Sequence, residues 1–332
     1  MTDTAQHELM HPTGDEAAWS ESYYFNFIDP ESRIGMFTRM GFRPGNGWAD
    51  ALHVIYLEGR RVAFTYGRRD IQKDLSLYDG DLTAGGLTLN CIEPHEQWQI
   101  VYEGPAQDIP DAEILLTRKK ERPDGWFTPA TLKMSLNFDC LTKPHYAAAG
   151  ARGHFEQSGR VHGTIALGDE TFQVDGFGVR DKSWGPRDWG AGDRESGSAA
   201  PASDGPAPFV NWFSMNFGDH AAIGGSCFRH KDGVVRGEGW MQRGGESLAL
   251  RNVVMETDYK PDSIIHDTVR LTAETETGES IEMTGQVSCV CPTKIPMPGG
   301  ATFVNEGLAE FRWGDRTGHG IAEHWHAVSL AG

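Results

Sequence analysis

Residues 176–189 read GFGVRDKSWGPRDW and carry two acids, three bases and two tryptophans. The first half predicts a β-strand, because Phe177 and Val179 would point to one face and the glycines at 176 and 178 would lie on the other. The strand is expected to end at Gly185-Pro186, because a proline nitrogen cannot donate a hydrogen bond to a neighbouring strand. This density of charge is atypical of a strand that only fills a core.

Three side chains of this stretch, Asp181, Trp184 and Arg187, are expected to cluster at the strand end, where polar groups can face the mouth of a cavity. The alternative is a structural corner. In that case Asp181 would pair with Arg180 or Arg187, and Trp184 would plug the corner. The residue types alone leave both interpretations open.

Strand signals continue along the whole chain. Short alternating runs rich in β-branched and aromatic residues cover 34–42, 51–57, 62–66, 87–92, 98–102, 132–138, 161–167, 209–217, 248–255, 269–275 and 321–328. Turn dipeptides separate them at Glu58-Gly59, Ser158-Gly159, Gly168-Asp169, Asp232-Gly233 and Thr277-Gly278. Helical periodicity is absent beyond a turn or two at 16–22. We predict an all-β protein of roughly twenty strands, closed into barrels that remove exposed sheet edges.

A short internal similarity favours two related β units: the sequence NFID at 26–29 is partly repeated as NFGD at 216–219. The division is placed near 144–153, where the strand pattern is interrupted. The expected organisation is a polar N-terminal tail at 1–18, a first β domain at 19–148 and a second at 149–332, with a flexible loop or lid at 190–208.

The charge balance limits the class of partner. Lys and Arg number 30 against 47 Asp and Glu, for a formal net charge of −17. This excess of acid argues against binding to nucleic acids or anionic membranes. Five scattered cysteines predict free thiols in a reducing compartment. No signal-peptide pattern is present and no apolar run approaches the ~20 residues that span a bilayer, so a cytoplasmic protein is expected.

The aromatic content is the next indication of function. Ten Trp, sixteen Phe and eight Tyr suit the wide interior of β-barrels, where rings line an apolar ligand site. Trp212 and Trp240 are candidates for such a lining, although rings of this kind also fill cores.

His154 and Glu156 form a second polar group. Strand parity places them on one face, so both point into a cavity or both into water. The alternative is a solvated hairpin tip marked by Ser158 and Arg160.

The C-terminal run Glu323-His324-Trp325-His326 resembles the opening of a cupin metal motif. That motif requires a carboxylate a few residues later, which residues 327–332 do not offer, so no metal is expected. Glu323 and Trp325 on one face, or His324 and His326 on the other, are then expected to line a pocket.

Several common motifs are missing from the sequence. A dinucleotide-binding glycine pattern before a helix, a phosphate-binding Gly-Lys-Ser/Thr loop and a Gly-X-Ser-X-Gly elbow are all absent. We therefore expect no organic cofactor. Proton transfer by carboxylates and imidazoles in an apolar setting remains, because burial raises a carboxyl pKa enough to make it an acid near neutral pH.

The segment GFGVRDKSWGPR at 176–187, preceded by HFEQ at 154–157 and followed by GIAEHWH at 320–326, resembles a little-characterised bacterial family of domain-of-unknown-function proteins. That family is similar to the hydroxyneurosporene synthase (carotenoid hydratase) and AttH-like group, which has two lipocalin-like, calycin-type barrels. Some fungal Diels–Alder cyclases use the same architecture. The family resemblance covers nearly the whole chain, whereas the link to the hydratases depends on the DKSWG core at 181–185. Those hydratases commonly have His beside the Asp, where this chain has Lys182, which weakens transfer of a His-assisted mechanism.

The resemblance implies a hydrophobic molecule held between or within two barrels. Asp181 would then be the proton donor or base, Trp184 would stabilise cationic character, and Arg187 would hold an oxygen or set the pKa of Asp181. The second-choice catalytic partners are His154, Glu323 and His326, and the remaining substrate-binding candidates are Glu156, Trp212, Trp240 and Trp325.

Two functions follow as hypotheses. The first is a cofactor-independent hydratase, dehydratase, lyase or isomerase that acts on a terpenoid, steroid-like or lignin-type aromatic molecule in a barrel cavity. The second is a lipocalin-like carrier that binds such a molecule unchanged. The polar density around Asp181 favours the enzyme, and a homodimer is compatible with either.

Overall fold

The computed structural model describes residues 4–13, 16–187, 208–218, 220–229, 234–297 and 300–329. These residues form β-strands and a few short 3₁₀ helices, so the prediction of an all-β protein is confirmed. The chain divides into two compact units. Unit 1 comprises Met1–Pro110 and Phe127–Arg187, and unit 2 comprises Asp111–Trp126 and Asp188–Gly332.

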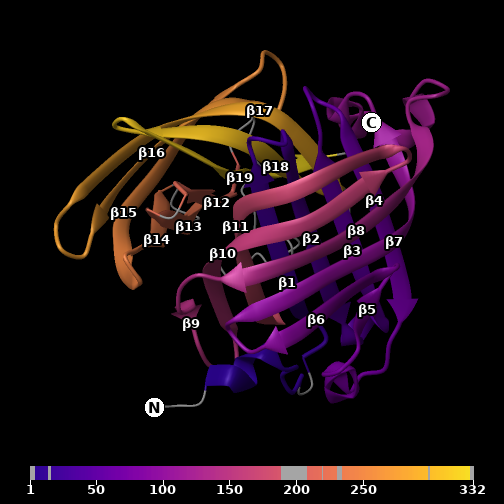
Figure 1. Ribbon diagram of the computed structural model, residues 1–332, viewed down its shortest axis with the longest axis horizontal. Helices are drawn as coiled ribbons and strands as arrows, with labels where there is room; N and C mark the ends of the chain where they lie inside the picture. The colour runs from indigo at the N-terminus through magenta and orange to yellow at the C-terminus, as the bar shows by residue number, and fades with distance from the viewer. Residues whose placement is uncertain are drawn as a thin grey trace. The chain divides into compact units, whose positions relative to one another are not determined.

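Unit 1 is built on one 11-stranded antiparallel sheet in the order β4-β3-β2-β1-β11-β10-β8-β7-β6-β5, with β9 paired to β10 (Figure 1). β4 also pairs with β7, so the strands from β4 to β7 in this order form a closed ring. The strands are β1 (Trp19–Asp29), β2 (Ile34–Arg43), β3 (Trp48–Tyr56), β4 (Val62–Asp70), β5 (Leu82–Ala84), β6 (Leu87–Glu93), β7 (Gln97–Ile109), β8 (Thr128–Cys140), β9 (His145–Ala148), β10 (Gly153–Leu167) and β11 (Glu170–Pro186).

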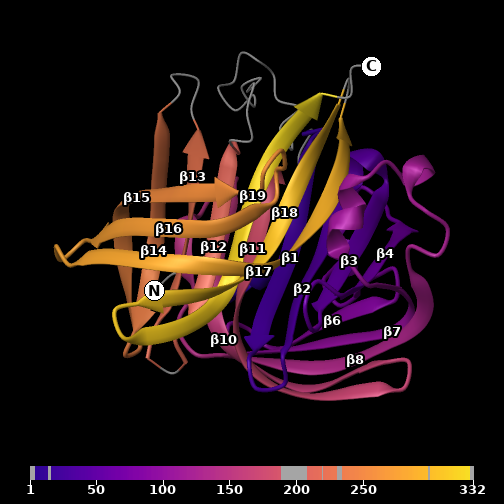
Figure 2. The same cartoon turned by 90° about the horizontal axis from the view of Figure 1, so that it is seen from above.

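Unit 2 is a closed barrel in which each strand pairs with the next and β12 pairs with β19 (Figure 2). This up-and-down order closes the sheet and leaves no free edge strand in the barrel. The strands are β12 (Val210–Asn216), β13 (Ala222–Arg229), β14 (Val235–Arg243), β15 (Glu246–Tyr259), β16 (His266–Thr275), β17 (Ser280–Met297), β18 (Gly300–Trp313) and β19 (Arg316–Ser329).

The short 3₁₀ helices are η1 (Thr4–Glu8), η2 (Pro44–Asn46), η3 (Leu75–Tyr78), η4 (Ala112–Leu116) and η5 (Lys119–Glu121). Helix η4 packs against β17, and Glu113 on it forms an ion pair with Lys260. These contacts explain why the segment Asp111–Trp126, which interrupts unit 1 in the sequence, belongs to unit 2.

Each unit has its own hydrophobic core, built from alternate residues of the strands. In unit 1 the core includes Phe25, Trp98 and Phe138, and in unit 2 it includes Phe213 and Phe311. Since successive side chains of a strand point to opposite faces, the residues between these core positions lie on the other face of each sheet.

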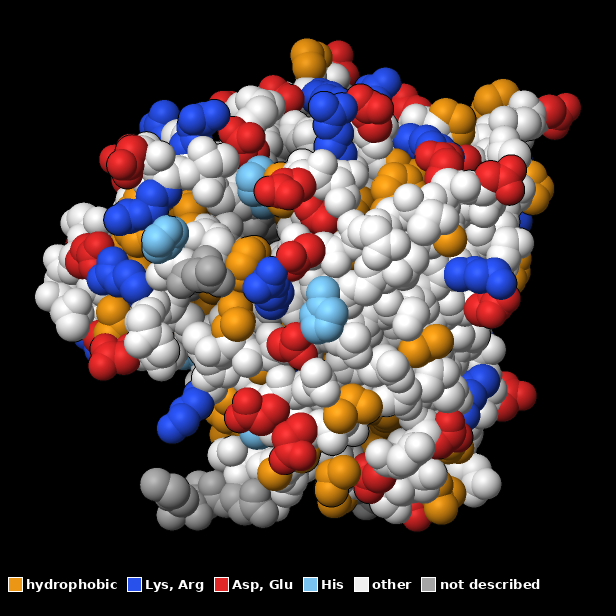
Figure 3. Space-filling model, in the orientation of Figure 1, with side chains coloured by type: hydrophobic (Ala, Val, Ile, Leu, Met, Phe, Trp, Pro, Cys, Tyr) orange, Lys and Arg blue, Asp and Glu red, His pale blue; other side chains and the backbone are white. Residues whose placement is uncertain are grey.

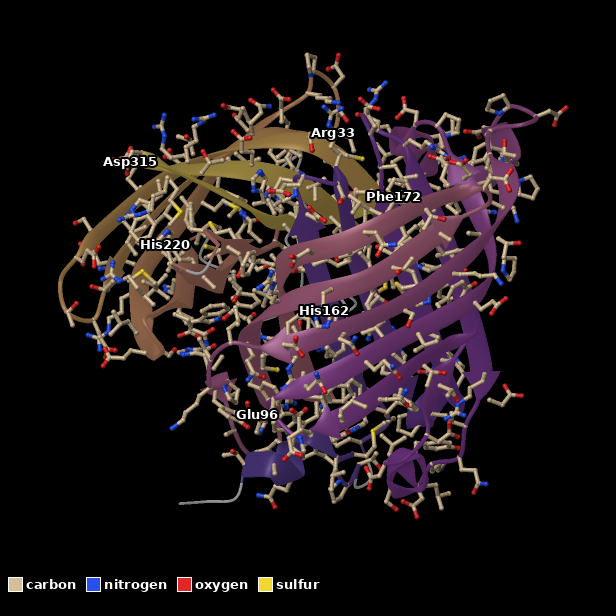
Figure 4. All side chains as sticks on the ribbon, viewed as in Figure 1. Arg33, Glu96, His162, Phe172, His220 and Asp315 are labelled. Atoms are coloured by element: carbon tan, nitrogen blue, oxygen red, sulfur yellow. The ribbon has the colours of Figure 1, made fainter. Side chains whose placement is uncertain are left out.

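The unit boundary differs from the predicted one. Division was expected between residues 148 and 149, but β10 and β11 are part of the unit 1 sheet, because β11 pairs with both β1 and β10. Figure 4 shows the two strands side by side, with His162 on β10 and Phe172 on β11. The boundary therefore lies after Arg187. Nearly all of the predicted flexible loop, residues 190–207, lies outside the described residues.

Two local predictions are also wrong. Ser158-Gly159 is not a turn but the middle of β10, where Gly159 is needed because a Cβ there would lie 2.1 Å from the Phe138 ring. The N-terminal segment is not simply a polar tail, since Glu8 is only 4% exposed and forms an ion pair with Arg180.

Acidic and basic side chains are interspersed on the face of the molecule shown in Figure 3. Within the described residues, no helix has the length and apolar character needed to cross a membrane.

Candidate active site

Successive side chains of β11 alternate between the two faces of the unit 1 sheet. Trp184 belongs to the hydrophobic core, and Arg180 and Lys182, which share its parity, contact core rings on the same side. Asp181 and Ser183 therefore lie on the opposite face. Asp181 does not point into the barrel interior, contrary to the expectation of a barrel cavity.

The face that carries Asp181 aligns polar side chains across neighbouring strands. Glu156 on β10 and Tyr24 on β1 both pair with Asp181, and Arg39 on β2 pairs with Tyr24. Side chains directly opposite each other on antiparallel strands have Cβ atoms about 5 Å apart. The register thus brings groups from distant parts of the sequence to one place.

A chain of hydrogen bonds links four side chains on this face, those of Glu156, His154, Ser183 and Asp181. His154 Nε2 is 2.9 Å from Glu156 Oε1, and His154 Nδ1 is 2.7 Å from Ser183 Oγ. Ser183 donates a long hydrogen bond of 3.4 Å to Asp181 Oδ1. Glu156 and Ser183 are buried, whereas His154 and Asp181 are partly exposed. The prediction that His154 and Glu156 share a face is confirmed.

The electrostatic setting changes the proton affinity of two of these groups. Burial raises the pKa of Asp181; the charges of His154 and Arg187 oppose this and that of Glu156 adds to it, and the net pKa is raised. Burial acts to lower the pKa of His154, but its hydrogen bond to Glu156 and the charges of Glu156 and Asp181 raise it overall. Both groups therefore hold a proton to higher pH than they would in water.

Guanidinium groups lie beside this cluster. Arg39 extends over Gly41, where a Cβ would be 2.5 Å from Arg39 Nη1. Asp50 forms ion pairs with Arg39 at 3.4 Å and with Arg43 at 2.9 Å. Burial, with the charge of Arg43, lowers the pKa of Arg39 to about 10. Gly41 thus makes the room in which the partly buried guanidinium of Arg39 lies along β2.

Arg187 is the next cation and follows directly after β11, which ends at Pro186 as predicted. Its backbone N–H donates to the carbonyl of Ala18 at 2.8 Å. Its charge acts to lower the pKa of both Asp181 and His154, against the net rise of each, so Arg187 influences the cluster electrostatically.

The opposite, core face of β11 also carries charges, but each one has a partner of opposite sign. Arg180 pairs with Glu8, and Lys182 pairs with Glu21, with all four side chains at most 2% exposed. Burial acts to raise the pKa of Glu8, but the charge of Arg180 and hydrogen bonds from His95 and Arg180 hold it far below its usual value. The Arg180–Glu8 pair and the hydrogen bond from Lys182 Nζ to the Leu9 carbonyl hold the N-terminal segment against the sheet.

The predicted grouping of Trp184 with Asp181 is wrong, because residues three apart on a strand point to opposite faces. The Trp184 ring stacks on His11 with a centroid distance of 4.0 Å, and its Nε1 donates to the Gly150 carbonyl at 2.9 Å. A Cβ at Gly153 would lie 1.9 Å from this ring. Trp184 therefore fills space in the core, which agrees with the alternative interpretation of this stretch as a structural corner.

The tryptophan candidates of the second half lie in unit 2, on the barrel face away from its core. Trp212 pairs with Glu323 across β12 and β19, and Trp325 Nε1 donates to Glu323 Oε1. Trp240 is 1% exposed and lies over Gly224, where a Cβ would be 2.5 Å from the ring. Whether these residues contact a substrate stays a prediction.

His324 and His326 point to the inside of the unit 2 barrel, on the face opposite Glu323 and Trp325, as parity predicts. They belong to unit 2, whereas Asp181 belongs to unit 1. Among the described residues, no group of three or more His, Cys, Asp or Glu is arranged to hold a metal ion.

The sequence reasoning missed two members of the cluster. Ser183 could have been found, since it lies two residues after Asp181 and so shares its face. Arg39 could not, because nothing in a single sequence shows that β2 and β11 both flank β1.

Solved structures share this fold over nearly the whole chain. A candidate AttH from Nitrosomonas europaea is 14% identical with a TM-score of 0.54, over 95% of this chain and 93% of that chain. CghA with Sch210972 is 12% identical with a TM-score of 0.52, over 95% and 89%. Kievitone hydratase from Nectria haematococca is 7% identical with a TM-score of 0.52, over 97% and 94%. At these identities the likeness shows the fold.

No curated protein matches the sequence. A family model described as a domain of unknown function, DUF7064, matches residues 4–328. The expected relation to a domain-of-unknown-function family with an AttH-like architecture of two lipocalin-like barrels is therefore confirmed. With nearly its whole length matched, this chain belongs to the DUF7064 family.

Proposed function

We propose that this protein is a cofactor-independent acid–base enzyme of the hydratase, dehydratase, lyase or isomerase type. Its substrate would be a hydrophobic small molecule, such as a terpenoid, a steroid-like compound or a lignin-type aromatic. The observation that carries the proposal is the hydrogen-bonded chain Glu156–His154–Ser183–Asp181 with its raised carboxyl pKa. The fold shared with kievitone hydratase adds support.

Asp181 is the proposed general acid. In a hydration, its O–H proton would pass to one carbon of a double bond, forming a C–H bond and leaving positive charge on the neighbouring carbon. A water molecule would add there and return a proton to the Asp181 carboxylate. A carboxyl group suits this work at neutral pH when burial raises its pKa, as it does here.

The neighbouring groups would position the acid and the substrate. His154 is held between Glu156 and Ser183, and Ser183 donates to Asp181, which fixes the direction of the carboxyl group. Arg39 and Arg187 bring positive charge to the same face and would hold an oxygen of the substrate. This arrangement favours a substrate with a hydroxyl or carbonyl oxygen near its reacting carbon.

Ser183, His154 and Glu156 also include the residue types of a serine-hydrolase triad. Two observations favour the acid–base role. Ser183 is only 2% exposed, and its hydroxyl donates to Asp181 rather than standing free to attack a carbonyl.

The test begins with mass spectrometry of small molecules that co-purify with the protein, followed by a turnover assay on those compounds. Asp181→Asn is expected to lower turnover roughly 10²- to 10⁴-fold, the usual contribution of a general acid, while binding persists. Asp175→Asn is the matched control, because Asp175 is an exposed residue of the same strand and parity that pairs with Arg160.

Equal turnover in Asp181→Asn and Asp175→Asn would remove Asp181 from the mechanism. Binding of the co-purified compound by the unaltered protein without any conversion would instead identify a carrier.

A further inference from the structure

The inside of the unit 2 barrel is divided into an apolar and a polar part. Toward one end it is filled by hydrophobic side chains such as Phe217, Ile281 and Phe311. Toward the end where β12 begins and β19 finishes, polar side chains replace them. In a barrel that only required a core, this polar group would be a net cost, since polar atoms removed from water need partners.

Three of these polar residues lie side by side. Asn211 on β12 and Asn305 on β18 both pair with His324 on β19, so the three side chains form one row across the inner face. His324 is 0% exposed, Asn305 is 0% and Asn211 is 7%. His266 packs on His324 with a ring centroid distance of 4.1 Å.

Each of the four residues has a buried polar atom with no hydrogen-bond partner among the described residues. These atoms are Asn211 Oδ1, Asn305 Oδ1, His324 Nε2 and His266 Nδ1. Adjacent buried polar atoms without hydrogen-bond partners (orphan atoms) are rare in folded proteins, where almost all buried polar groups are paired. These four atoms therefore have hydrogen-bonding capacity that the described residues do not use.

The chemistry of the orphan atoms restricts the kind of molecule that could bind them. His266 Nε2 donates to the Ala322 carbonyl at 2.9 Å, which leaves Nδ1 as an acceptor. Burial lowers the pKa of His266 to about 3 and that of His324 far below its usual value, so both imidazoles are neutral near pH 7. The two asparagine Oδ1 atoms are acceptors as well. A molecule that binds them thus carries hydrogen-bond donors and needs no charge.

Rings form the adjoining wall. Tyr259 contacts His324 and His326 with centroid distances of 5.9 and 5.6 Å, and its hydroxyl is 3.2 Å from His324 Nδ1. Phe303 pairs with His326 on the same inner face. The nearby cation Arg229 stands at the end of β13, where its Nε donates to the carbonyl of Pro208. Flat aromatic walls beside neutral acceptors suit a planar ring better than a flexible or charged molecule.

We propose that the polar end of the unit 2 barrel is a second binding site, which takes a small neutral aromatic compound bearing a hydroxyl or N–H donor, a phenol in the simplest case. Asn211 Oδ1, Asn305 Oδ1 and His266 Nδ1 accept its hydrogen bonds, and His324 Nε2 hydrogen-bonds to it from the same row. The rings of Tyr259, His326 and Phe303 pack on it. This site is independent of the Asp181 cluster and of the function proposed for it.

The experiment compares phenol with toluene, which has a similar shape but no donor. Dissociation constants are measured by calorimetry on the full chain, and histidine ¹⁵N resonances are followed by NMR. Phenol is expected to bind about tenfold more tightly than toluene, the difference made by one hydrogen bond, and to shift the resonances of His266 and His324. His324→Phe should remove the difference between the two compounds, whereas His319→Phe, on the other face of β19, should preserve it.

Three results would overturn the proposal. Equal affinity for phenol and toluene would show that no orphan acceptor is used. Phenol binding that shifts His154 instead would locate the ligand at the Asp181 cluster. Resonances of His266 and His324 that do not respond to saturating phenol would mean that water alone satisfies the row. None of the three results needs a variant, so a failure of His324→Phe to fold leaves the test intact.

Discussion

The two faces of β11 carry charges of the same kinds and use them in opposite ways. On the core face, Arg180 and Lys182 are neutralised by Glu8 and Glu21, so every charge has a partner and the pKa of each carboxyl group is lowered. On the other face, Asp181 has a raised pKa. A carboxylate stabilised by a paired cation serves structure, whereas a carboxyl group with a raised pKa is typical of catalytic acids.

The comparison also shows how one strand separates the two roles. Adjacent residues alternate between faces, so Asp181 is flanked in sequence by Arg180 and Lys182 without forming an ion pair with either. A charged run that seems to be a single cluster in the sequence is in fact two clusters separated by the thickness of the sheet.

The largest effect on stability is expected from breaking the core-face pairs. Lys182→Met removes the lysine partner of buried Glu21 and leaves it only the hydrogen bonds with His11, so the free energy of unfolding should fall by roughly 3–5 kcal/mol. Urea denaturation measures this change. The double variant Lys182→Met/Glu21→Leu should recover part of the loss, because the unpaired charge is then gone. A loss under about 1 kcal/mol in the single variant, as at exposed ion pairs, would contradict a structural role for this face.

A smaller effect is expected from Ser183→Ala, which removes the hydroxyl that orients Asp181. Turnover should fall about tenfold with little change in KM, the usual scale for losing one hydrogen bond. Because Ser183 donates to the carboxylate, its removal should also move the loss of activity at high pH, where Asp181 deprotonates, to still higher pH. Ser135→Ala, at an exposed position on β8, is the control. An unchanged pH profile would argue against this positioning role.

The smallest expected effect is a change in how the free energy of unfolding depends on pH, and it should have opposite signs for Asp181 and for Glu8 on the other face. The pKa of Asp181 is raised in the folded state, so its ionisation weakens folding as pH rises through the range between the unfolded value of about 3.9 and the folded one. Asp181→Asn should therefore raise the free energy of unfolding near pH 7, and the gain should disappear below about pH 3.9.

The contribution of Glu8 has the opposite sign. Its pKa is lowered by Arg180, so its stabilisation is present above the unfolded value of about 4.3 and is lost as the pH falls further. Urea unfolding curves across this pH range measure both trends. If Asp181→Asn lowered stability at neutral pH, the carboxylate would be a stabilising ion-pair partner and the two faces would not differ in kind.

The sequence by itself determined the local features of this protein. Alternation and turn chemistry predicted the all-β fold, the end of β11 at Pro186, the shared face of His154 and Glu156, and the opposite faces of Glu323 and His324. These follow from the period of an extended chain, which any single strand reveals.

Only the tertiary structure decided which face of each strand became the core and which residues met there. The burial of Glu8, the position of Arg39 beside the Asp181 cluster and the assignment of β10 and β11 to unit 1 all depend on strands pairing across long stretches of chain. The parity of β11 is visible in its own residues. The partners that neutralise the charges on one face, and those that surround Asp181 on the other, come from elsewhere in the fold. Local sequence fixes side-chain direction, whereas long-range register fixes what each side chain meets.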